Sequence, residues 1–381
     1  MKAELYEVLS LSILTPFSSE FHNYFSSFLS FSVIESSISE VNMKALIVGG
    51  SGVISTYIVK RLLSKDWEVW VLNRGRHSDR LPEGVKTIEA DIHNEDDVRQ
   101  KLGSLTFDTV SEFNAFTVSD VERDWRLFSG RTRQYLFTSS ASAYLKPCSN
   151  YVITEGTTLQ NRYWEYSRNK ALCEKYLMDR NGENGTFVTN IRPSHTYCEY
   201  SIPFGLHGVN GPWQQAKRMI DGKRVIVPGD GTSLWTLTHS LDFAVGYTGL
   251  MGNTHAYGEA FHITGDEVLT WNQIYETVAE ALGVEFRPCY VPSDFLARTG
   301  KKYGYDFEGA LLGDKANSVV FDNSKLKRVV PEMRTTVLFH EGVRRSVEYF
   351  LTHPERQKED RDFDAYSDRV IAAMDEAEKR V

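Results

Sequence analysis

The chain has 381 residues, more than one compact core usually organises, and its 41% hydrophobic and 25% charged residues are typical of a folded protein. This composition excludes disorder along the whole chain. The formal net charge of -8 disfavours broad attraction to nucleic acid or anionic lipid, and no run is long and apolar enough to span a bilayer, so we expect neither partner.

The cysteines and the N-terminal segment bear on the compartment. The four cysteines stand singly, without a CxxC pair, so we expect reduced thiols in a cytoplasmic protein and no bound metal. Residues 1–42 are rich in Ser and Phe, but acidic residues interrupt the apolar stretch that a signal peptide needs. We therefore predict that 1–42 is a poorly ordered extension and that the domain begins at Met43.

From Lys44 onward, short apolar runs alternate with helical patterns. Six runs are typical of buried strands: residues 44–48, 68–72, 85–89, 109–113, 134–138 and 186–191. The stretches between them predict helices, of which the first ends at 65 and the others cover 94–102, with Asn94 as its cap, 118–128 and 164–178. This order predicts an α/β fold with a doubly wound parallel sheet, a Rossmann domain, over residues 43–192.

After Arg192-Pro193 the pattern changes to shorter elements with more Gly and Pro. We predict helices over 211–221 and 270–282 and strands over 224–227, 233–238 and 286–291. They indicate a smaller C-terminal α/β lobe over residues 193–354, which holds the substrate and returns in part to the Rossmann domain. The highly charged residues 355–381 predict a solvated helix or tail.

Three glycines stand between the first strand and the first helix. Gly49, Gly50 and Gly52 allow a tight turn and a close backbone approach to a pyrophosphate, which the N–H groups of the following helix also attract. Ser55 stands where a third glycine is commonest. The motif predicts a bound dinucleotide, with contacts from Gly49, Gly50, Ser51, Gly52, Val53 and Ile54.

The residues that follow the next strands predict the cofactor's chemistry. The second strand ends at Asn73-Arg74-Gly75 without the acidic residue that would bind an adenosine ribose, while Arg74 can pair with a 2′-phosphate. The sequence therefore favours NADP over NAD, unless Arg74 is a solvated residue or stacks on adenine without discriminating. Further contacts are predicted where the third and fourth strands end, at Asp91, Ile92, Asn114 and Ala115, although these residues are equally readable as strand-end caps.

Tyr166 and Lys170 are the candidate catalytic residues. Four residues apart on a helix, they share a face, and a nearby ammonium favours the phenolate form of a tyrosine. Tyr166 can then take or return a proton while a hydride moves to or from a nicotinamide. Ser140, in a run of hydroxyls after the fifth strand, can align the substrate oxygen.

These motifs, in this order, resemble the extended short-chain dehydrogenases, the NAD-dependent epimerase/dehydratase family. The resemblance covers roughly residues 44–281 and rests on GGSG, SSASAY, YxxxK, RPS at 192–194, GDGTSLWTLTHSLDF and FHITGDEVLTW. It implies that Ser140, Tyr166 and Lys170 form a catalytic triad, that substrates are commonly nucleotide sugars and that the protein dimerises. Further expected cofactor contacts are Thr138, Tyr166, Lys170, Arg192 and Ser194.

Two departures from the family's pattern bear on the substrate. Ala141-Ser142 stands where sugar dehydratases carry an Asp-Glu pair, which disfavours a 4,6-dehydratase. Trp235 stands where sugar-nucleotide epimerases place an arginine on the phosphates, so a nucleotide sugar loses its expected partner. Arg192, Lys217, Arg218 or Lys223 could replace that arginine, although each is more commonly a surface charge. The candidate substrate contacts are Ser142, His195 and Trp235.

The sequence thus predicts an NAD(P)-dependent epimerase or oxidoreductase, a homodimer that acts on a sugar-like hydroxyl or keto substrate. One alternative is an NADPH-dependent ketone reductase, which would release its cofactor in each cycle. The other is a non-catalytic RNA-binding member of the fold, because the NRG end of the second strand is similar to that of chloroplast stem-loop-binding proteins. The negative net charge and the intact Ser–Tyr–Lys set disfavour this second alternative.

Overall fold

A seven-stranded parallel sheet organises the described chain, which comprises residues 42–75 and 81–381 of a computed structural model. Of the predicted extension, residues 1–41 lie outside the described residues. All neighbouring strands in the sheet are parallel. Their order confirms the predicted doubly wound fold. It runs β11 (Glu259–Ile263), β7 (Phe187–Pro193), β5 (Thr132–Thr138), β4 (Phe107–Glu112), β1 (Lys44–Val48), β2 (Glu68–Asn73), β3 (Lys86–Glu89).

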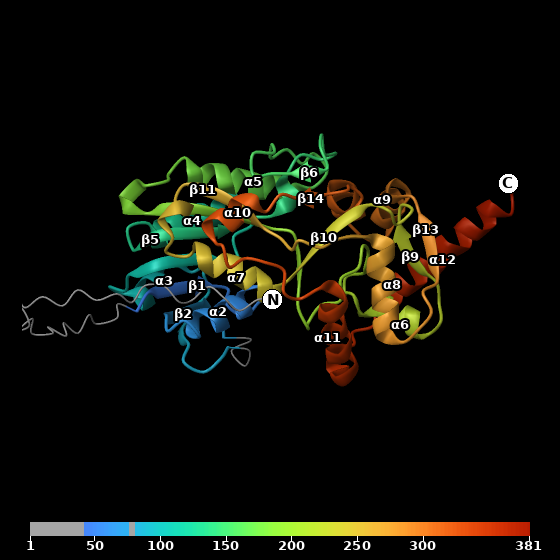
Figure 1. Ribbon diagram of the computed structural model, residues 1–381, viewed down its shortest axis with the longest axis horizontal. Helices are drawn as coiled ribbons and strands as arrows, with labels where there is room; N and C mark the ends of the chain where they lie inside the picture. The colour runs from blue at the N-terminus through green and yellow to red at the C-terminus, as the bar shows by residue number, and fades with distance from the viewer. Residues whose placement is uncertain (1–41, 76–80) are drawn as a thin grey trace, which may run out of the picture. The chain divides into compact units, whose positions relative to one another are not determined.

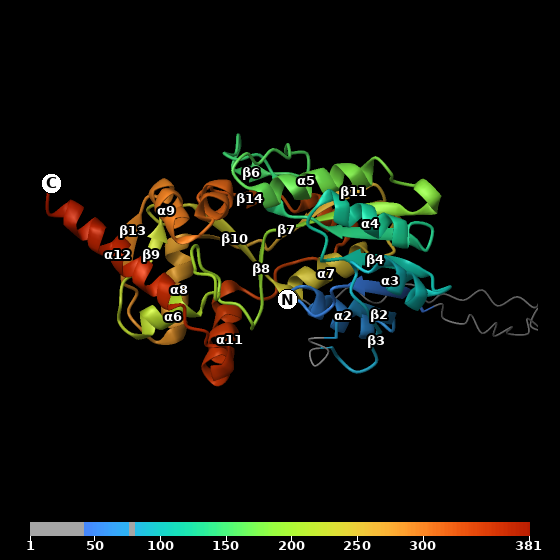
Figure 2. The ribbon, with the colours of Figure 1, turned by 180° about the vertical axis from the view of Figure 1, so that it is seen from behind.

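The sheet is covered by helices on both faces (Figures 1 and 2). In β1, Ala45 and Ile47 pack against helices on one face, whereas Leu46 and Val48 pack against helices on the other. Burial on both faces explains why this strand reads as a continuous apolar run in the sequence. The first face carries α2 (Ser55–Leu63) and α7 (Ser240–Leu250), and the second carries α3 (Glu95–Leu102), α4 (Val118–Phe128) and α5 (Glu165–Met178).

Capping side chains set where two of these helices begin. The side chain of Asn94 accepts a hydrogen bond from the backbone N–H of Asp97 at the start of α3, which confirms the predicted cap. Thr117 and Asp120 form a reciprocal capping box at the start of α4. The observed bounds of α4 are those that the sequence predicts.

A second group of elements gathers at one end of the sheet, as both ribbon views show (Figures 1 and 2). Its core is rich in aromatic side chains, among them Trp213, Trp235 and Trp271. Its strands are β8 (His195–Tyr197), β10 (Leu234–His239) and β12 (Val268–Thr270) in one sheet, and β9 (Val225–Pro228) and β13 (Pro288–Val291) in another. Its helices are α6 (Trp213–Ile220), α8 (Trp271–Leu282), α9 (Ser293–Gly300), α11 (Phe339–Thr352) and a π-helix, η6 (Glu308–Lys315).

The chain returns to the main sheet after it has entered this second group. Helix α7 and strand β11 follow β10 in the sequence, but they belong to the core on the first face of the main sheet. Helix α10 (Ser324–Val329) packs against the same core. A partial return was expected, although neither α7 nor β11 was predicted. The remaining short elements are β6 (Val152–Ile153) and β14 (Val320–Phe321), which pair, and the single turns η2 (Ala141–Ala143), η3 (Glu183–Gly185), η4 (Thr254–Ala256), η5 (Lys301–Tyr303) and η7 (Pro354–Arg356).

The charged C-terminal segment forms helix α12 (Arg361–Glu378). One face of α12 is buried, with Phe363 and Tyr366 in a core shared with β9, β13, α9 and η6. Arg218 on α6 fastens the helix through Asp364 at 2.6 Å and Asp368 at 2.8 Å. The prediction of a helix is therefore confirmed, but the prediction that it is simply solvated is wrong, because its aromatic residues fill a core.

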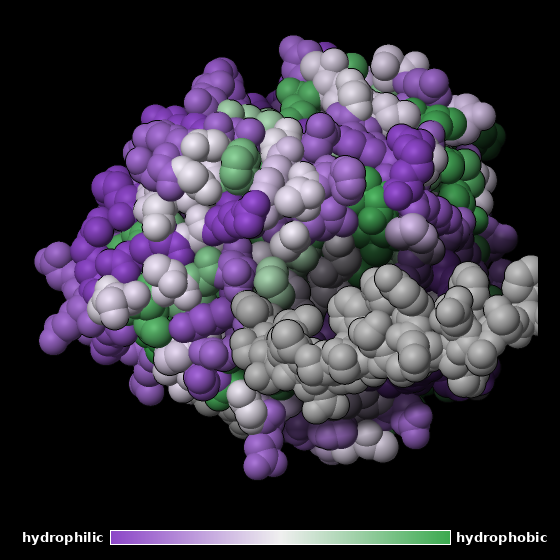
Figure 3. Space-filling view, turned by 60° about the vertical axis from the view of Figure 1, so that its left-hand side comes forward, coloured by the Kyte–Doolittle hydropathy of each residue, from purple (hydrophilic) through white to green (hydrophobic). Residues whose placement is uncertain are grey.

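The surface is largely polar on the face that Figure 3 shows. Hydrophilic residues predominate there, and hydrophobic residues lie between them in smaller groups. Within residues 42–75 and 81–381, no helix has the length and apolar character needed to cross a bilayer.

Candidate active site

A cavity of 550 Å³ opens at the carboxyl ends of β1, β2, β3 and β4. Ligands of doubly wound sheets bind at this edge. His93, Phe116 and Asp120 line the cavity although the sequence did not point to them. Eight predicted cofactor residues also line it: Gly49, Ser51, Gly52, Asn73, Arg74, Asp91, Ile92 and Asn114.

The glycine turn at this cavity leaves no room for a side chain at Gly49 or Gly50. Gly49 has a φ of +87°, and a Cβ atom there would lie 2.6 Å from Nδ2 of Asn114. A Cβ on Gly50 would lie 2.7 Å from Cγ2 of Val71, so this residue packs against the sheet. Ser55 closes the turn, because its hydroxyl donates to the carbonyl of Gly49 at 2.7 Å and accepts from the N–H of Gly52 at 2.9 Å. The bare backbone that results fits the pyrophosphate of a dinucleotide.

Arg74 lies exposed at the rim of the same cavity. Within the described part of the chain, no hydrogen bond or ion pair engages its guanidinium. The side chain of Asn73 accepts a hydrogen bond from the N–H of Gly75 at 2.8 Å, which shapes the turn that carries Arg74. The guanidinium is thus placed where it can meet a phosphate on an adenosine ribose.

Lys170 stands between the nucleotide cavity and the rest of the site. It is buried, and its ammonium donates to the carbonyls of Ala115 and Thr138, both at 2.7 Å. These two predicted cofactor residues therefore act by holding Lys170. The ammonium lies 5.8 Å from the centre of the Tyr166 ring, and burial lowers the pKa of Lys170 to about 8.

Tyr166 lines a second cavity of 270 Å³ together with Ser140 and Ser142. Burial raises the pKa of the phenol above its ordinary value, and hydrogen bonding to Ser140 only partly offsets that rise. In the protein without a cofactor, Lys170 therefore does not lower the pKa of Tyr166 in the way that the sequence predicts. The reason is that burial removes water from the phenol, while two carbonyls already engage the ammonium.

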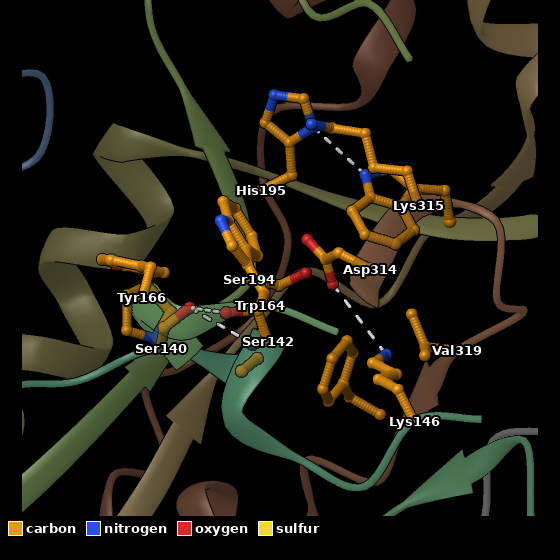
Figure 4. Close-up of a pocket in the computed structure, with 14 residues that line it drawn as sticks. Ser140, Ser142, Lys146, Trp164, Tyr166, Ser194, His195, Asp314, Lys315 and Val319 are labelled. Carbon is orange, nitrogen blue, oxygen red and sulfur yellow. Dashed lines mark hydrogen bonds and ion pairs between the residues drawn. The ribbon is translucent and has the colours of Figure 1, made fainter. Parts of the chain in front are cut away.

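The serines of the second cavity form a chain of hydroxyls. Ser140 Oγ and Ser142 Oγ lie 2.8 Å apart, and Ser142 Oγ lies 2.7 Å from Ser167 Oγ on α5. Figure 4 shows Ser140, Ser142 and Tyr166 close together on one side of this cavity. The chain ties the end of β5 to the helix that carries Tyr166.

The opposite side of the second cavity comes from segments far along the sequence (Figure 4). His195 and Trp235, both predicted as substrate contacts, line it, and Trp235 Nε1 donates to His195 Nδ1 at 3.1 Å. Burial lowers the pKa of His195 to about 3, so its ring is neutral at neutral pH. Ser194, predicted as a cofactor contact, lies here rather than in the nucleotide cavity. The lining residues that sequence reasoning missed are Lys146, Trp164, Asp314, Lys315, Val319 and Phe321.

Asn161 joins the two sides of the second cavity. Its Nδ2 donates to the carbonyl of Ser142 at 2.7 Å and to that of Gly313 at 2.6 Å. Its Oδ1 accepts the backbone N–H groups of Tyr163 at 3.0 Å and Trp164 at 3.2 Å, just before α5 begins. One buried amide thus connects the serine loop, the start of α5 and the π-helix η6.

The structure does not bring Arg192 to either cavity. Its guanidinium pairs with Glu174 at 2.6 Å and donates to the hydroxyl of Tyr144 at 3.1 Å and to the carbonyl of Glu155 at 3.0 Å. These partners occupy it inside the protein, so its expected contact with the cofactor is not supported. Neither Val53, Ile54 nor Gly75 lines the nucleotide cavity itself.

The other proposed replacement cations are also engaged elsewhere. Lys217 pairs with Asp221 at 3.0 Å, and Arg218 pairs with Asp364 of α12 at 2.6 Å. Lys223 pairs with the same Asp364 at 2.8 Å. None of the three lines the second cavity. The ion pairs of Lys217 and Lys223 agree with the alternative interpretation of surface charges, whereas Arg218 is buried.

Comparison with known proteins agrees with this fold. The model of the NAD dependent epimerase/dehydratase family matches residues 45–127 and 126–263, more than half of the chain. The chain therefore belongs to the NAD-dependent epimerase/dehydratase family.

Its curated relatives differ in what their names describe. A 2'-dehydrokanamycin reductase from Streptomyces kanamyceticus is 25% identical over 258 residues, which are 68% of this chain and 72% of the relative. A chloroplast stem-loop binding protein of 41 kDa from Arabidopsis thaliana is 26% identical over 285 residues, 69% of this chain and 70% of the relative.

Solved structures show the same architecture at low sequence identity. UDP-glucose 4-epimerase from Thermotoga maritima superposes with a TM-score of 0.64 at 20% identity and covers 82% of this chain and all (100%) of its own. An epimerase from Methanothermobacter thermautotrophicus gives a TM-score of 0.67 at 15% identity, over 83% of this chain and 94% of its own. At these identities the likeness establishes the fold.

Proposed function

We propose that this protein transfers a hydride between a nicotinamide dinucleotide and the hydroxyl or keto carbon of a sugar-like substrate, with Tyr166 moving the proton. The observation that carries this proposal is the placement of Lys170. Its ammonium is held by carbonyls that follow β4 and end β5, beside the nucleotide cavity, and Tyr166 lies one helical turn away at the second cavity. A cofactor and a substrate would therefore meet at these two side chains.

Each residue of the site would have its own role in this reaction. A bound nicotinamide supplies or accepts the hydride. Tyr166 Oη is protonated at neutral pH and would donate this proton to the substrate oxygen as a carbonyl is reduced. Burial raises the pKa of the phenol, so the substrate oxygen must become strongly basic as the hydride arrives before the proton is transferred. Ser140 Oγ would hydrogen-bond that oxygen and orient it. Lys170 has one N–H that the two carbonyls do not engage, and it would donate this N–H to the cofactor's ribose beside the phenol.

Arg74 supports NADP as the preferred dinucleotide. Its guanidinium lies at the rim of the nucleotide cavity, where a 2′-phosphate would be. Calorimetric titration with NADPH and NADH tests the cofactor assignment, and we expect NADPH to bind more tightly in the wild type but not in Arg74→Ala. Absence of binding by both nucleotides would overturn the proposed function as a whole.

Net reduction and epimerisation are distinguished by the fate of the cofactor. A reductase oxidises NADPH as substrate is consumed, whereas an epimerase retains its cofactor and the absorbance of NADPH returns to its starting value. The Streptomyces kanamyceticus relative is named a reductase, which favours net reduction. A stoichiometric loss of NADPH with a keto sugar would support this assignment, and a retained cofactor would support epimerisation.

Binding to RNA is a second candidate function. It is favoured by the Arabidopsis thaliana relative, which is named a stem-loop binding protein. The net charge of -8 disfavours it, because RNA affinity depends on cationic contacts with phosphates. Filter binding of a stem-loop RNA at moderate salt tests it, and we expect no retention at micromolar protein concentration.

A further inference from the structure

The wall of the second cavity that faces Tyr166 carries three charged side chains. Lys146, Asp314 and Lys315 all line this cavity, and Figure 4 shows them on the side opposite Ser140 and Tyr166. Apolar side chains of Trp164, Val319 and Phe321 surround them in the lining; placed among such neighbours, charges interact strongly with a ligand.

Lys146 is buried, and its ammonium makes no hydrogen bond within the described residues. Its side chain is 2% exposed, and its ammonium lies 3.9 Å from Oδ1 of Asp314, which is an ion-pair distance but too long for a hydrogen bond. Within the described residues it has no other charged partner. A buried ammonium with one distant carboxylate leaves donors available to a ligand.

Lys315 presents a second ammonium to the same space. It lies at the end of the π-helix η6, and its side chain also lines an adjoining cavity of 200 Å³. Its backbone is fixed, because Trp271 Nε1 donates to its carbonyl at 2.9 Å. No acceptor within residues 42–75 and 81–381 engages its Nζ atom. Burial lowers the pKa of Lys315, and the charge of the neighbouring Asp314 only partly offsets this effect.

Basic side chains outnumber acidic ones in the lining of the cavity. Two lysines and one aspartate line it, and the neutral His195 adds no charge. Burial lowers the pKa of Lys315 and raises that of Asp314, so the buried ammonium would gain from a bound anion that pairs with it. None of the cations that the sequence suggested as replacements reaches this cavity. The position of the expected arginine is filled by Trp235, which stacks on Trp271 with ring centres 5.3 Å apart.

We propose that Lys315, supported by Lys146, binds a phosphate or carboxylate that the substrate itself carries. The substrate class is then a compact anionic sugar derivative, such as a sugar phosphate or a uronate, rather than a neutral sugar. A volume of 270 Å³ suits a ligand of this size. This inference rests on the proposed function, since it assigns the substrate of the same cavity.

The test compares three matched probes on the full chain saturated with NADPH. D-glucose, D-glucose 6-phosphate and D-glucuronate differ only in the group on one carbon, and calorimetry gives a dissociation constant for each. We expect at least one anionic probe to bind roughly tenfold or more tightly than glucose, because a charge-assisted contact is gained. Whichever anion is preferred identifies the group as phosphate or carboxylate.

Substitutions at the lysines test whether these side chains cause the preference for an anionic probe. Lys315→Met is expected to lose the preference for the anion while it keeps the affinity for NADPH, and Lys315→Arg is expected to retain the preference. Asp314→Asn removes the opposing carboxylate and is expected to tighten binding of the anion. Lys302→Met removes an exposed lysine outside both cavities and serves as the matched control.

Two results would overturn the inference. One is that neither anionic probe is preferred over glucose, including the case in which neither binds. The other is a preference that survives in both Lys315→Met and Lys146→Met. The proposed function fails separately, by loss of NADPH binding or by full turnover in Tyr166→Phe, whatever the anion preference of the cavity.

Discussion

At the scale of residues, Tyr166 carries the proposed chemistry. We expect Tyr166→Phe to bind NADPH with unchanged affinity and to lose turnover by about 10²–10⁴-fold, because the ring remains but the acidic proton is gone. Tyr163→Phe is the matched control, since Tyr163 lines neither cavity and its hydroxyl accepts a hydrogen bond from Arg162 at 2.7 Å. Turnover that is equal in both variants would remove Tyr166 from the mechanism.

Burial of Lys170 predicts a pH dependence of stability. Below pH 8 the lysine is protonated in the folded and unfolded states, and the folded state bears the full cost of burying the charge. Between about 8 and 10.5 the folded protein has released a proton that the unfolded chain retains, so its stability rises with pH. Above 10.5 both states are neutral and the effect is complete.

The measurement is urea unfolding of the wild type and of Lys170→Met on both sides of this range. The difference in unfolding free energy between them is expected to shift in favour of the wild type by up to about 3 kcal/mol as pH rises. The contributions of the other titrating groups to the pH dependence of stability cancel in this difference. A constant difference would show that the pKa of Lys170 is not depressed.

Sequence reasoning found those site residues that their neighbours along the chain reveal. Tyr166 and Lys170 share a helical face, and Ser140 follows a strand, so local spacing sufficed. Lys315 shares no local pattern with them and reaches the cavity only through the path of η6. Arg192 was misjudged because its partner Glu174 lies on α5 and the pairing is set by packing.

At the scale of elements, the turn between β1 and α2 requires a glycine at position 49. Gly49→Ala places a side chain at a φ of +87° and 2.6 Å from the amide of Asn114. We expect it to lower the free energy of unfolding by about 1–3 kcal/mol and to weaken NADPH binding at least tenfold. Thermal unfolding and calorimetry measure the two effects.

Gly52→Ala is the control that distinguishes backbone strain at Gly49 from the general effect of replacing a glycine in this turn. Gly52 has no positive φ, and a Cβ there would first meet Ser55 Oγ, at 3.4 Å. We expect nearly unchanged stability in this variant. Equal destabilisation by both substitutions would contradict the account of Gly49.

The elements that sequence reasoning predicted are those with a clear period or clear end signals. The amphipathic helix α4 has the predicted bounds because Thr117 caps it. Helix α7 was missed because it is buried over most of its surface, so it has no polar face to give a helical period. Strand β11 was missed since only tertiary pairing with β7 shows that the chain returns to the sheet.

At the scale of the whole molecule, the nucleotide cavity and the core under α12 belong to different groups of elements. Tyr366→Ala is expected to lower the free energy of unfolding by about 3–5 kcal/mol, because this ring is buried among Tyr305, Phe307 and Phe363. Since Phe307 and Leu311 of the same core support η6, we expect a raised KM for the substrate and an unchanged Kd for NADPH.

Glu376→Ala, in an exposed pair with Arg380 on the same helix, is the control and is expected to change neither quantity. If Tyr366→Ala raises the Kd for NADPH and the KM for the substrate by the same factor, the two groups of elements do not respond independently.

The amide of Asn161 has a consequence for selectivity. Because it grips the backbone at Ser142 and at Gly313 together, it holds the proton-donating end of the cleft at a set span from the ammonium of Lys315. If the proposed proton donor and the proposed anion site both act on the substrate, this span would limit the length of the substrate. Only compounds whose reactive group and anionic group are separated by the matching distance would then engage both ends at once.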